Sequence, residues 1–394
     1  MTEKQLNEYT QKIHRATLTL DTHIDIEVTS VTPDKAGEIG YEKLASFAKM
    51  DEGRLDGAFF AAYAIQDDLS DEKYRHALEL TLEKIEMIHR AAEKTFTDQV
   101  AIAYHPEDVV RIHQDGKKIA IIALENGYPI GEDIGNVRKL YDRGVRYITL
   151  CHNGHNQICD SNMNPNGPES IHNGLSPFGE KVVSEMNRLG IIVDISHCSK
   201  KTTLDAIALS KAPVIASHSA CRGICDESRN IDDEQLFALK RNGGVINIIA
   251  INEYIKKTSP ERLDAIGKLR ESFDLPLDFW KFLCVFPGKS VETRNSYLQE
   301  LQKLDAKFPL ANVEDYVDHI DHVAKLIGVD HVGIGSDYYS GYLSLEGWKD
   351  AGEIPHVTQE LIKRKYSDEN IGKIWSGNLL RVWEEADKIA LQRK

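Results

Sequence analysis

Short, almost wholly apolar segments alternate along this chain with longer segments in which apolar residues recur at helical spacing. Continuous apolar runs are typical of strands that are covered on both faces, as in a parallel sheet. Eight such runs are predicted strands: Thr17–Leu20, Gly57–Gln66, Lys118–Glu125, Val145–Cys151, Ile191–Ile195, Pro213–Ser217, Gly244–Ile251 and His331–Asp337. The segments with helical spacing are predicted helices: Asp67–Asp98, Ile134–Gly144, Pro177–Leu189, Lys200–Ser210, Asp232–Asn242, Val317–Ile327, Ser367–Trp375 and Asn378–Ala390.

Eight strands that alternate with helices predict an α/β fold, most simply a (β/α)₈ barrel of the TIM type. We expect one domain over residues 1–394. The strand–helix rhythm stops between residues 252 and 313, which predicts a helical insertion, or lid, between strands seven and eight. A doubly wound open sheet is the alternative, but the first strand is followed by DTHID rather than by a glycine-rich phosphate loop.

The charge and the length of apolar runs narrow the classes of partner. The 394 residues carry a formal net charge of −14, which argues against nucleic acid or an anionic membrane surface as the partner. No apolar run approaches the roughly 20 residues of a membrane-spanning helix. The polar N-terminal sequence resembles no signal peptide, so we expect a cytoplasmic protein; a periplasmic or secreted location stays open if a leader was removed.

Six cysteines, none in a CxxC pair, are expected to be buried free thiols.

Residues that can bind a metal ion stand at the ends of most predicted strands. The carboxyl ends of barrel strands meet at one face, where barrel enzymes carry their chemistry. Mixed imidazole and carboxylate ligands favour Zn²⁺ first, with Mn²⁺, Co²⁺ or Fe²⁺ as substitutes. The set exceeds the needs of one tetrahedral ion, so two ions that share a bridging carboxylate fit better, and Glu125 is the natural bridge. The predicted ligands and neighbours are His23, Asp25, Glu125, His152, His197, His218 and Asp337.

Several of these residues stand in longer motifs. In order, the motifs are DTHID, LENG, RYITLCHN, GLSPFGEKVVSEMNRLG, VDISHCS, ASHS, SRN, HVGIGSD and SGNLLRVW. Together they resemble the renal-type membrane dipeptidases of the amidohydrolase superfamily, especially the bacterial members. The resemblance implies a binuclear zinc (β/α)₈ barrel that hydrolyses dipeptides with a metal-bridging hydroxide. It also implies a homodimer and tolerance of a D-residue at the C-terminal position of the substrate.

The resemblance implies a role for each metal ligand. His23 and Asp25 would hold one zinc ion, His197 and His218 would hold the other, and Glu125 would bridge the two.

It also implies roles around the substrate. Asp337 would accept the proton of the bridging water and pass it to the leaving amine. His152 would steady the oxygen of the tetrahedral intermediate, and Arg229 would pair with the C-terminal carboxylate of the dipeptide, as a guanidinium fork can. Asn156, in the loop that follows His152, is a further predicted substrate contact.

Some positions depart from the family pattern or are weaker candidates. The eighth strand continues as Tyr338 to Gly341 instead of Phe-Asp-Gly, and the loop after His152 carries a second histidine, His155. Both lie beside the predicted pocket and affect substrate preference rather than metal chemistry. His319 and His322 are predicted to be surface residues of a helix.

Two other functions stay open. A different amidohydrolase reaction, on a lactone, cyclic amide or N-acyl amino acid, would share the metal site and differ in what Arg229 recognises. A non-enzymatic binding protein on the same barrel would be expected to have lost ligands, and the sequence retains the set.

Overall fold

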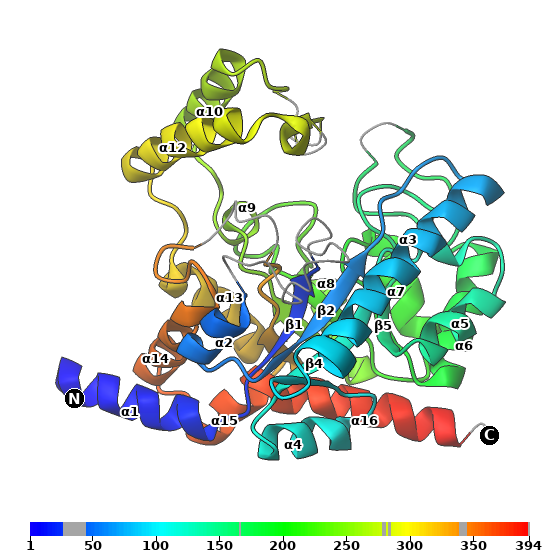
Figure 1. The fold of residues 1–394 in the computed structure, drawn as a ribbon, viewed down its shortest axis with the longest axis horizontal. Coiled ribbons are helices and arrows are strands. Elements are labelled where there is room, and N and C mark those ends of the chain that lie inside the picture. Colours follow the sequence, from blue (N-terminus) through cyan, green and yellow to red (C-terminus); the bar gives the residue numbers. More distant parts are fainter. Residues whose placement is uncertain (27–44, 165–166, 278–280, 283–284, 339–344, 393–394) are drawn as a thin grey trace.

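Eight parallel strands form a nearly closed barrel in the computed structural model, which describes residues 1–26, 45–164, 167–277, 281–282, 285–338 and 345–392 (Figure 1). Their spatial order follows the sequence: β1 Leu20–Asp25, β2 Gly57–Tyr63, β4 Lys118–Glu125, β5 Val145–Thr149, β6 Ile192–Asp194, β7 Ile215–Ser219, β8 Val245–Ile248 and β9 Val332–Ile334. A parallel bridge between Ile24 and Tyr338 brings the end of the last strand back to the first. The predicted TIM-type barrel is therefore confirmed.

The first strand lies later in the chain than predicted. It runs from Leu20 to Asp25 instead of Thr17 to Leu20, so the HxD triplet belongs to the strand itself. The buried side chain of Asp21 explains this extension, because its Oδ1 accepts hydrogen bonds from the backbone N–H groups of His23 and Ser336. The polar residue Asp21 is thus part of a buried strand, since it bonds to the segment that follows β9 rather than to solvent.

Helices surround the barrel, and most follow the predicted ranges. They are α1 Glu3–Ala16, α2 Phe47–Gly53, α3 Asp71–Arg90, α4 Pro106–Gln114, α5 Gly135–Asp142, α6 Pro177–Leu189, α7 Lys200–Leu209, α8 Asp233–Asn242, α13 Val313–Leu326, α14 Pro355–Lys363, α15 Asp368–Gly372 and α16 Asn378–Leu391. The α6 helix starts at Pro177, as predicted, and the Ser176 hydroxyl caps it by accepting from the Gly179 N–H at 2.9 Å. The sequence interpretation missed α4, α14 and the three-residue strand β3 Val100–Ile102, which pairs with β4.

The segment between β8 and α13 is helical, as predicted. It contains α9 Asn252–Ile255, α10 Pro260–Ser272, a 3₁₀ turn at Phe286–Gly288 and α12 Val291–Lys307. Figure 1 shows α10 and α12 side by side, away from the barrel and beyond the strand ends. Arg262 joins them through a 2.8 Å ion pair with Asp305. Closure of this pair as a lid stays a prediction.

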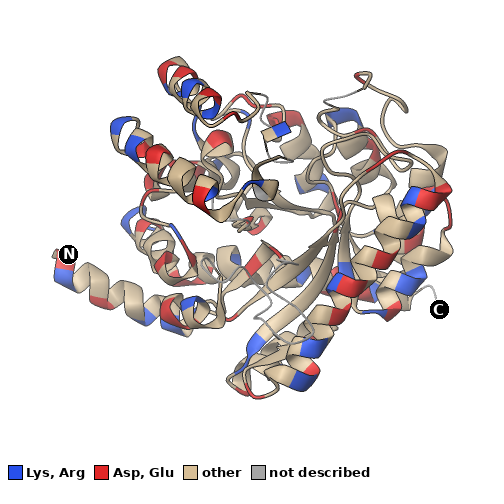
Figure 2. Ribbon diagram, turned by 45° about the horizontal axis from the view of Figure 1, so that its top comes forward, with Lys and Arg blue, Asp and Glu red and all other residues tan. Residues whose placement is uncertain are grey.

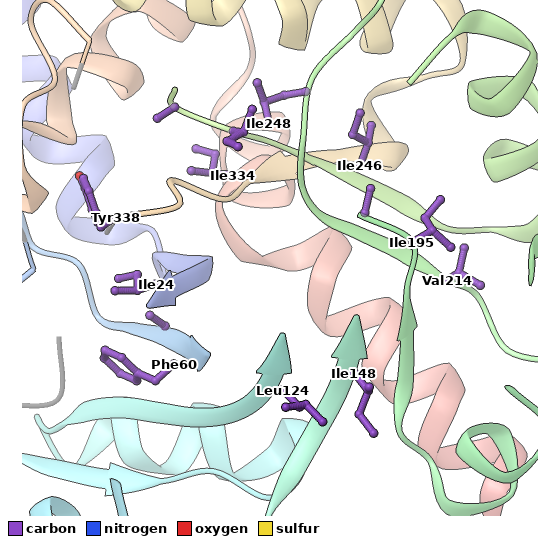
Figure 3. Packing of buried hydrophobic residues seen from close by; sticks show 14 of the residues in the cluster. Ile24, Phe60, Leu124, Ile148, Ile195, Val214, Ile246, Ile248, Ile334 and Tyr338 are labelled. Carbon is purple, nitrogen blue, oxygen red and sulfur yellow. The ribbon is translucent and has the colours of Figure 1, made fainter. Parts of the chain in front are cut away.

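Buried apolar residues form two main clusters, one on the outer face of the barrel strands and one on their inner face. Ile24, Phe60, Leu124 and Ile148 belong to the outer cluster, between strands and helices (Figure 3). Residues of opposite parity, among them Phe59, Ala123 and Tyr147, belong to a second cluster that includes Trp383 of α16. Since successive strand residues point to opposite faces, His23, Asp25 and Glu125 share the inward face with this second cluster.

Charged residues lie mainly on the outer helices, whereas the strands carry few (Figure 2). In the part of the chain that the structure describes, no helix is long and apolar enough to cross a membrane.

Candidate metal centre

The strand ends bring the predicted ligands together in one buried cluster. Three overlapping groups each have ligand atoms within 4.8 Å of one another. The first is His23, Asp25 and Glu125; the second is Glu125, His152 and His197; the third is His23, His218 and Asp337. Residues from β1, β4, β7 and the segments after β5, β6 and β9 thus meet at one point, as the barrel predicts.

The carboxylate of Glu125 stands between two sets of histidines. Its Oε1 lies 3.1 Å from His197 Nε2 and 3.3 Å from His218 Nε2. Its Oε2 lies 3.6 Å from His23 Nε2, on the other side. Each oxygen therefore faces a different set, which is the arrangement that a bridging carboxylate needs.

Two more carboxylates complete the His23 side. Asp25 Oδ1 is 3.4 Å and Asp337 Oδ1 is 3.7 Å from His23 Nε2. Among the described residues, His23 Nε2 and Asp25 Oδ1 are buried atoms with no hydrogen-bond partner. Buried polar atoms are rarely left unsatisfied, so these two atoms fit a bound cation.

A hydrogen-bonded chain fixes the tautomer of His218. The Ser217 hydroxyl donates its one proton to Asp194 Oδ2 at 2.6 Å. Ser217 Oγ also lies 2.7 Å from His218 Nδ1. Because that proton is already committed to Asp194, His218 Nδ1 must be the donor to Ser217. His218 Nε2 then carries a lone pair directed into the cluster. Metal-bound histidines are typically oriented by such partners.

The same reasoning applies to His197. Its Nδ1 lies 3.0 Å from Asn153 Oδ1, an oxygen that can only accept, so Nδ1 carries the hydrogen and Nε2 the lone pair. The two Nε2 atoms of His197 and His218 are only 2.9 Å apart. Two lone pairs at this distance repel each other unless a cation lies beside them. The donor set therefore fits divalent metal ions.

Tyr147 orients the third histidine, and the sequence interpretation missed it. Its hydroxyl lies 2.6 Å from His23 Nδ1, and its ring is fully buried inside the barrel. The only signal in the sequence was its inward position in the strand VRYIT, which gives no hint of a partner on β1.

Burial disfavours the charged form of several residues in the cluster. It raises the pKa of Glu125, and it raises the pKa of Asp337 to about 8. Burial, together with the nearby Arg229 guanidinium, lowers the pKa of His152 to about 3 and holds the pKa of His197 and His218 well below the ordinary value. The imidazoles of His152, His197 and His218 are therefore neutral, as ligands must be. His23 differs: burial lowers its pKa, but Tyr147 and the Glu125 and Asp25 carboxylates outweigh burial and hold that pKa well above the ordinary value. The crowded carboxylates favour a compensating cation.

Three residues at the strand ends adopt the left-handed backbone conformation. Asn126, His197 and Asp337 have φ values of 74°, 66° and 61°. This conformation is costly for residues other than glycine and is concentrated at functional sites. It turns the chain directly after β4, after β6 and after β9, where ligands must leave the strand direction.

Arg229 is buried beside the cluster. Its Nη1 donates to Ser219 Oγ and its Nη2 to the His218 carbonyl, both at 2.7 Å. Its buried Nε has no hydrogen-bond partner among the described residues. The guanidinium is thus fixed to the end of β7 next to a metal-ligand candidate.

His152 stands at the edge of the cluster. Its Nε2 is 3.7 Å from Glu125 Oε1, and its ring packs against those of Tyr63 and His197. Its side chain keeps 20% of its surface exposed, more than His23, His197 or His218. This position is open to a substrate.

Asn156 and His155 are not brought into the cluster. Asn156 is fully buried; its amide nitrogen donates to Asn126 Oδ1 and the Leu150 carbonyl, and its oxygen accepts from the N–H groups of Ile158 and Cys159. His155 Nδ1 accepts from the Ser161 N–H. Both side chains hold the loop together.

The prediction for His319 is wrong, because the residue is fully buried. Its Nδ1 accepts from the Cys221 N–H at 3.0 Å and its Nε2 lies 2.9 Å from the Ile255 carbonyl. The expectation of buried free thiols holds for the five described cysteines, while Cys284 lies outside the described residues. Tyr339 to Gly341, which depart from the family pattern, lie outside them too.

Comparison with known proteins decides the family. The model of the membrane dipeptidase family, peptidase family M19, matches residues 7–394. The chain belongs to this family. It is 33% identical over 353 residues to dipeptidase verJ of Clonostachys rogersoniana, covering 88% of this chain and 76% of that protein. It is 30% identical over 367 residues to dipeptidase tcpJ of Claviceps purpurea, covering 92% and 72%.

A solved structure agrees with this membership. The probable dipeptidase PvdM from Pseudomonas aeruginosa superposes with a TM-score of 0.82 at 32% identity, covering 99% of this chain and all of that one. The chain is therefore a metallodipeptidase of family M19 with buried histidine and glutamate residues in position to hold metal.

Proposed function

We propose that the protein hydrolyses small dipeptides with two zinc ions, which share Glu125. The observation that carries the proposal is the position of the two carboxylate oxygens of Glu125. One oxygen faces His197 and His218, and the other faces His23. His23 and Asp25 would hold one ion, and His197 and His218 the other. Two ions so held would lower the pKa of a water and polarise the substrate carbonyl.

The surrounding side chains would position the dipeptide. Arg229 carries an unpartnered buried Nε and a fixed guanidinium, which suit the C-terminal carboxylate of the substrate. His152, neutral and partly exposed, can donate an N–H to the oxygen of the scissile carbonyl. These two contacts would place the peptide bond over Glu125.

Asp337 is suited to move the proton. Burial raises the pKa of its carboxyl group, which makes the Asp337 carboxylate a stronger base. It would accept this proton from the attacking water at Oδ1 and give it to the leaving amine nitrogen. One C–O bond forms and one C–N bond breaks, and the water's second hydrogen leaves with the new carboxylic acid.

Metal removal tests the ion count. Dialysis against a chelator should abolish cleavage of a dipeptide library, and Zn²⁺ should restore it together with at least two bound zinc ions per chain. Activity that survives complete metal removal would contradict the proposal.

Carboxylate recognition needs a separate test. Arg229→Ala should lower kcat/KM for a dipeptide by roughly 10–100-fold, as loss of a charge-assisted hydrogen bond does, and should affect the C-terminal amide of the same dipeptide much less. Ser219→Ala, which removes a partner of Arg229 but keeps the guanidinium, is the matched control. Equal losses on acid and amide would favour another amidohydrolase reaction.

A further inference from the structure

Three cysteines from different segments converge behind the metal centre. Cys151 follows β5, Cys159 lies in the loop between β5 and α6, and Cys198 lies between β6 and α7. All three are buried, and their sulfur atoms lie within 4.8 Å of one another. None has a role in the dipeptidase chemistry.

The sulfur spacing is that of thiolates around one metal ion. Cys151 Sγ and Cys198 Sγ are 3.9 Å apart. Zinc–thiolate bonds are about 2.3 Å long, so two sulfurs on one tetrahedral ion stand about 3.8 Å apart. The observed spacing therefore needs little rearrangement to accept an ion.

The two remaining described cysteines show what ordinary buried thiols look like in this fold. Cys221 Sγ donates to the His319 carbonyl and Cys225 Sγ to the Glu253 carbonyl, a contact that Cys151 Sγ also makes with the His197 carbonyl at 3.6 Å. Neither Cys221 nor Cys225 belongs to a group of ligand atoms among the described residues. Burial of a thiol is thus common in this protein, whereas convergence of three is confined to the cluster.

We propose that Cys151, Cys159 and Cys198 form a second metal site, for a soft divalent cation such as Zn²⁺ or Cd²⁺. Thiolate ligands select soft ions, and a divalent ion leaves only one net negative charge in this buried place, against two for Cu(I). Binding forms three metal–sulfur bonds and releases the three thiol protons to solvent. No electron transfer is involved.

The site is joined to the dipeptidase centre through the backbone. Cys151 directly precedes His152, and Cys198 directly follows His197. The Ser161 hydroxyl oxygen lies 2.5 Å from the His152 carbonyl oxygen and 3.1 Å from the His197 carbonyl oxygen, so its one proton is shared between them. An ion held by the three sulfurs would brace the segments that position His152 and His197.

Cadmium titration tests the site without reference to activity. The protein is first loaded with Zn²⁺ under reducing conditions, and Cd²⁺ is then added while the ultraviolet thiolate-to-cadmium charge-transfer band is recorded. We expect the band to saturate at one Cd²⁺ per chain, as Cd²⁺ displaces Zn²⁺ from the three sulfur atoms. The His and carboxylate centre has no sulfur ligand and gives no such band, so failure of the dipeptidase proposal would leave this result unchanged.

Matched variants locate the ion. Cys151→Ser and Cys198→Ser should lose the band, whereas Cys221→Ser, Cys225→Ser and Cys284→Ser should keep it. A ¹¹³Cd NMR spectrum of the unmodified protein gives the same answer if a variant fails to fold, because sulfur ligands shift the resonance far from the range of nitrogen and oxygen ligands. A missing band, or a band that persists in Cys151→Ser, would overturn the proposal.

Discussion

Two histidines of equal burial behave differently in this molecule. His218 and His319 both have 0% exposure. His319 uses both ring nitrogens for backbone partners, the Cys221 N–H and the Ile255 carbonyl. His218 spends Nδ1 on Ser217 and points Nε2 at His197 Nε2 and Glu125. Burial alone therefore does not identify a histidine as a metal ligand. The distinguishing feature is a buried ring nitrogen that faces other ligand atoms and has no hydrogen-bond donor as its partner.

The largest contrast is expected in catalysis. His218→Ala should lower kcat/KM by about 10³-fold or more, because a metal ion supplies several kcal/mol of transition-state stabilisation. His319→Gln should change kcat/KM by no more than a few-fold in steady-state assays of dipeptide cleavage. If His319→Gln lost as much activity and bound metal as His218→Ala, the comparison would fail.

Stability against pH gives the next contrast. Burial lowers the pKa of His319 to about 4, from an ordinary value of 6.5. Between these two pH values the unfolded chain binds a proton at His319 that the folded chain does not bind. The neutral, buried His319 therefore contributes fully to the free energy of unfolding above pH 6.5, and this contribution is lost as the pH falls towards 4. The loss is on the order of 3 kcal/mol.

Urea unfolding of the wild type and His319→Gln at several pH values isolates this effect. The variant lacks the titrating group, so the difference between the two free energies of unfolding should shrink from pH 7 to pH 4.5. A difference that stays constant would mean that folding leaves the pKa of His319 unchanged, and would contradict this account.

A similar comparison of two buried tyrosines tests the residues that orient the histidine ligands. Tyr147→Phe removes the hydroxyl beside His23 Nδ1 and should weaken zinc binding about 10–100-fold, the usual effect of losing such a partner. Tyr316→Phe is the matched control, since its buried hydroxyl donates to the Ile248 carbonyl and touches no ligand. Competition with a zinc chelator measures both. Equal zinc affinities in the two variants would contradict the orienting role of Tyr147.

The sequence predicted the barrel because parallel strands buried on both faces leave continuous apolar runs, such as Lys118–Glu125. It predicted β1 too early because Asp21 looks like the end of an apolar run, although it is buried against Ser336. It missed β3, whose three residues are too short to show a period. The local pattern of apolar residues therefore predicts which segments are buried, but it does not predict hydrogen bonds between residues that are far apart in the sequence.

The site followed the same division. His23, Glu125, His197 and His218 could be found because each stands at a strand end, where a barrel collects its chemistry. Tyr147 and Asn153 could not be found, because the histidines they contact come from other segments of the chain. Ser217 adjoins His218, but its role depends on Asp194 of β6, which the sequence does not reveal. His319 was misjudged because a histidine among helical polar residues resembles a surface position until its two backbone partners are known.

Anomalous scattering at the zinc edge, from crystals of the zinc-loaded protein, tests the central claim most directly. We expect two peaks that flank the Glu125 carboxylate, one beside His23 and Asp25 and the other beside His197 and His218, and none at His319. A single peak on one side of Glu125, or no peak beside the Glu125 carboxylate, would contradict the account.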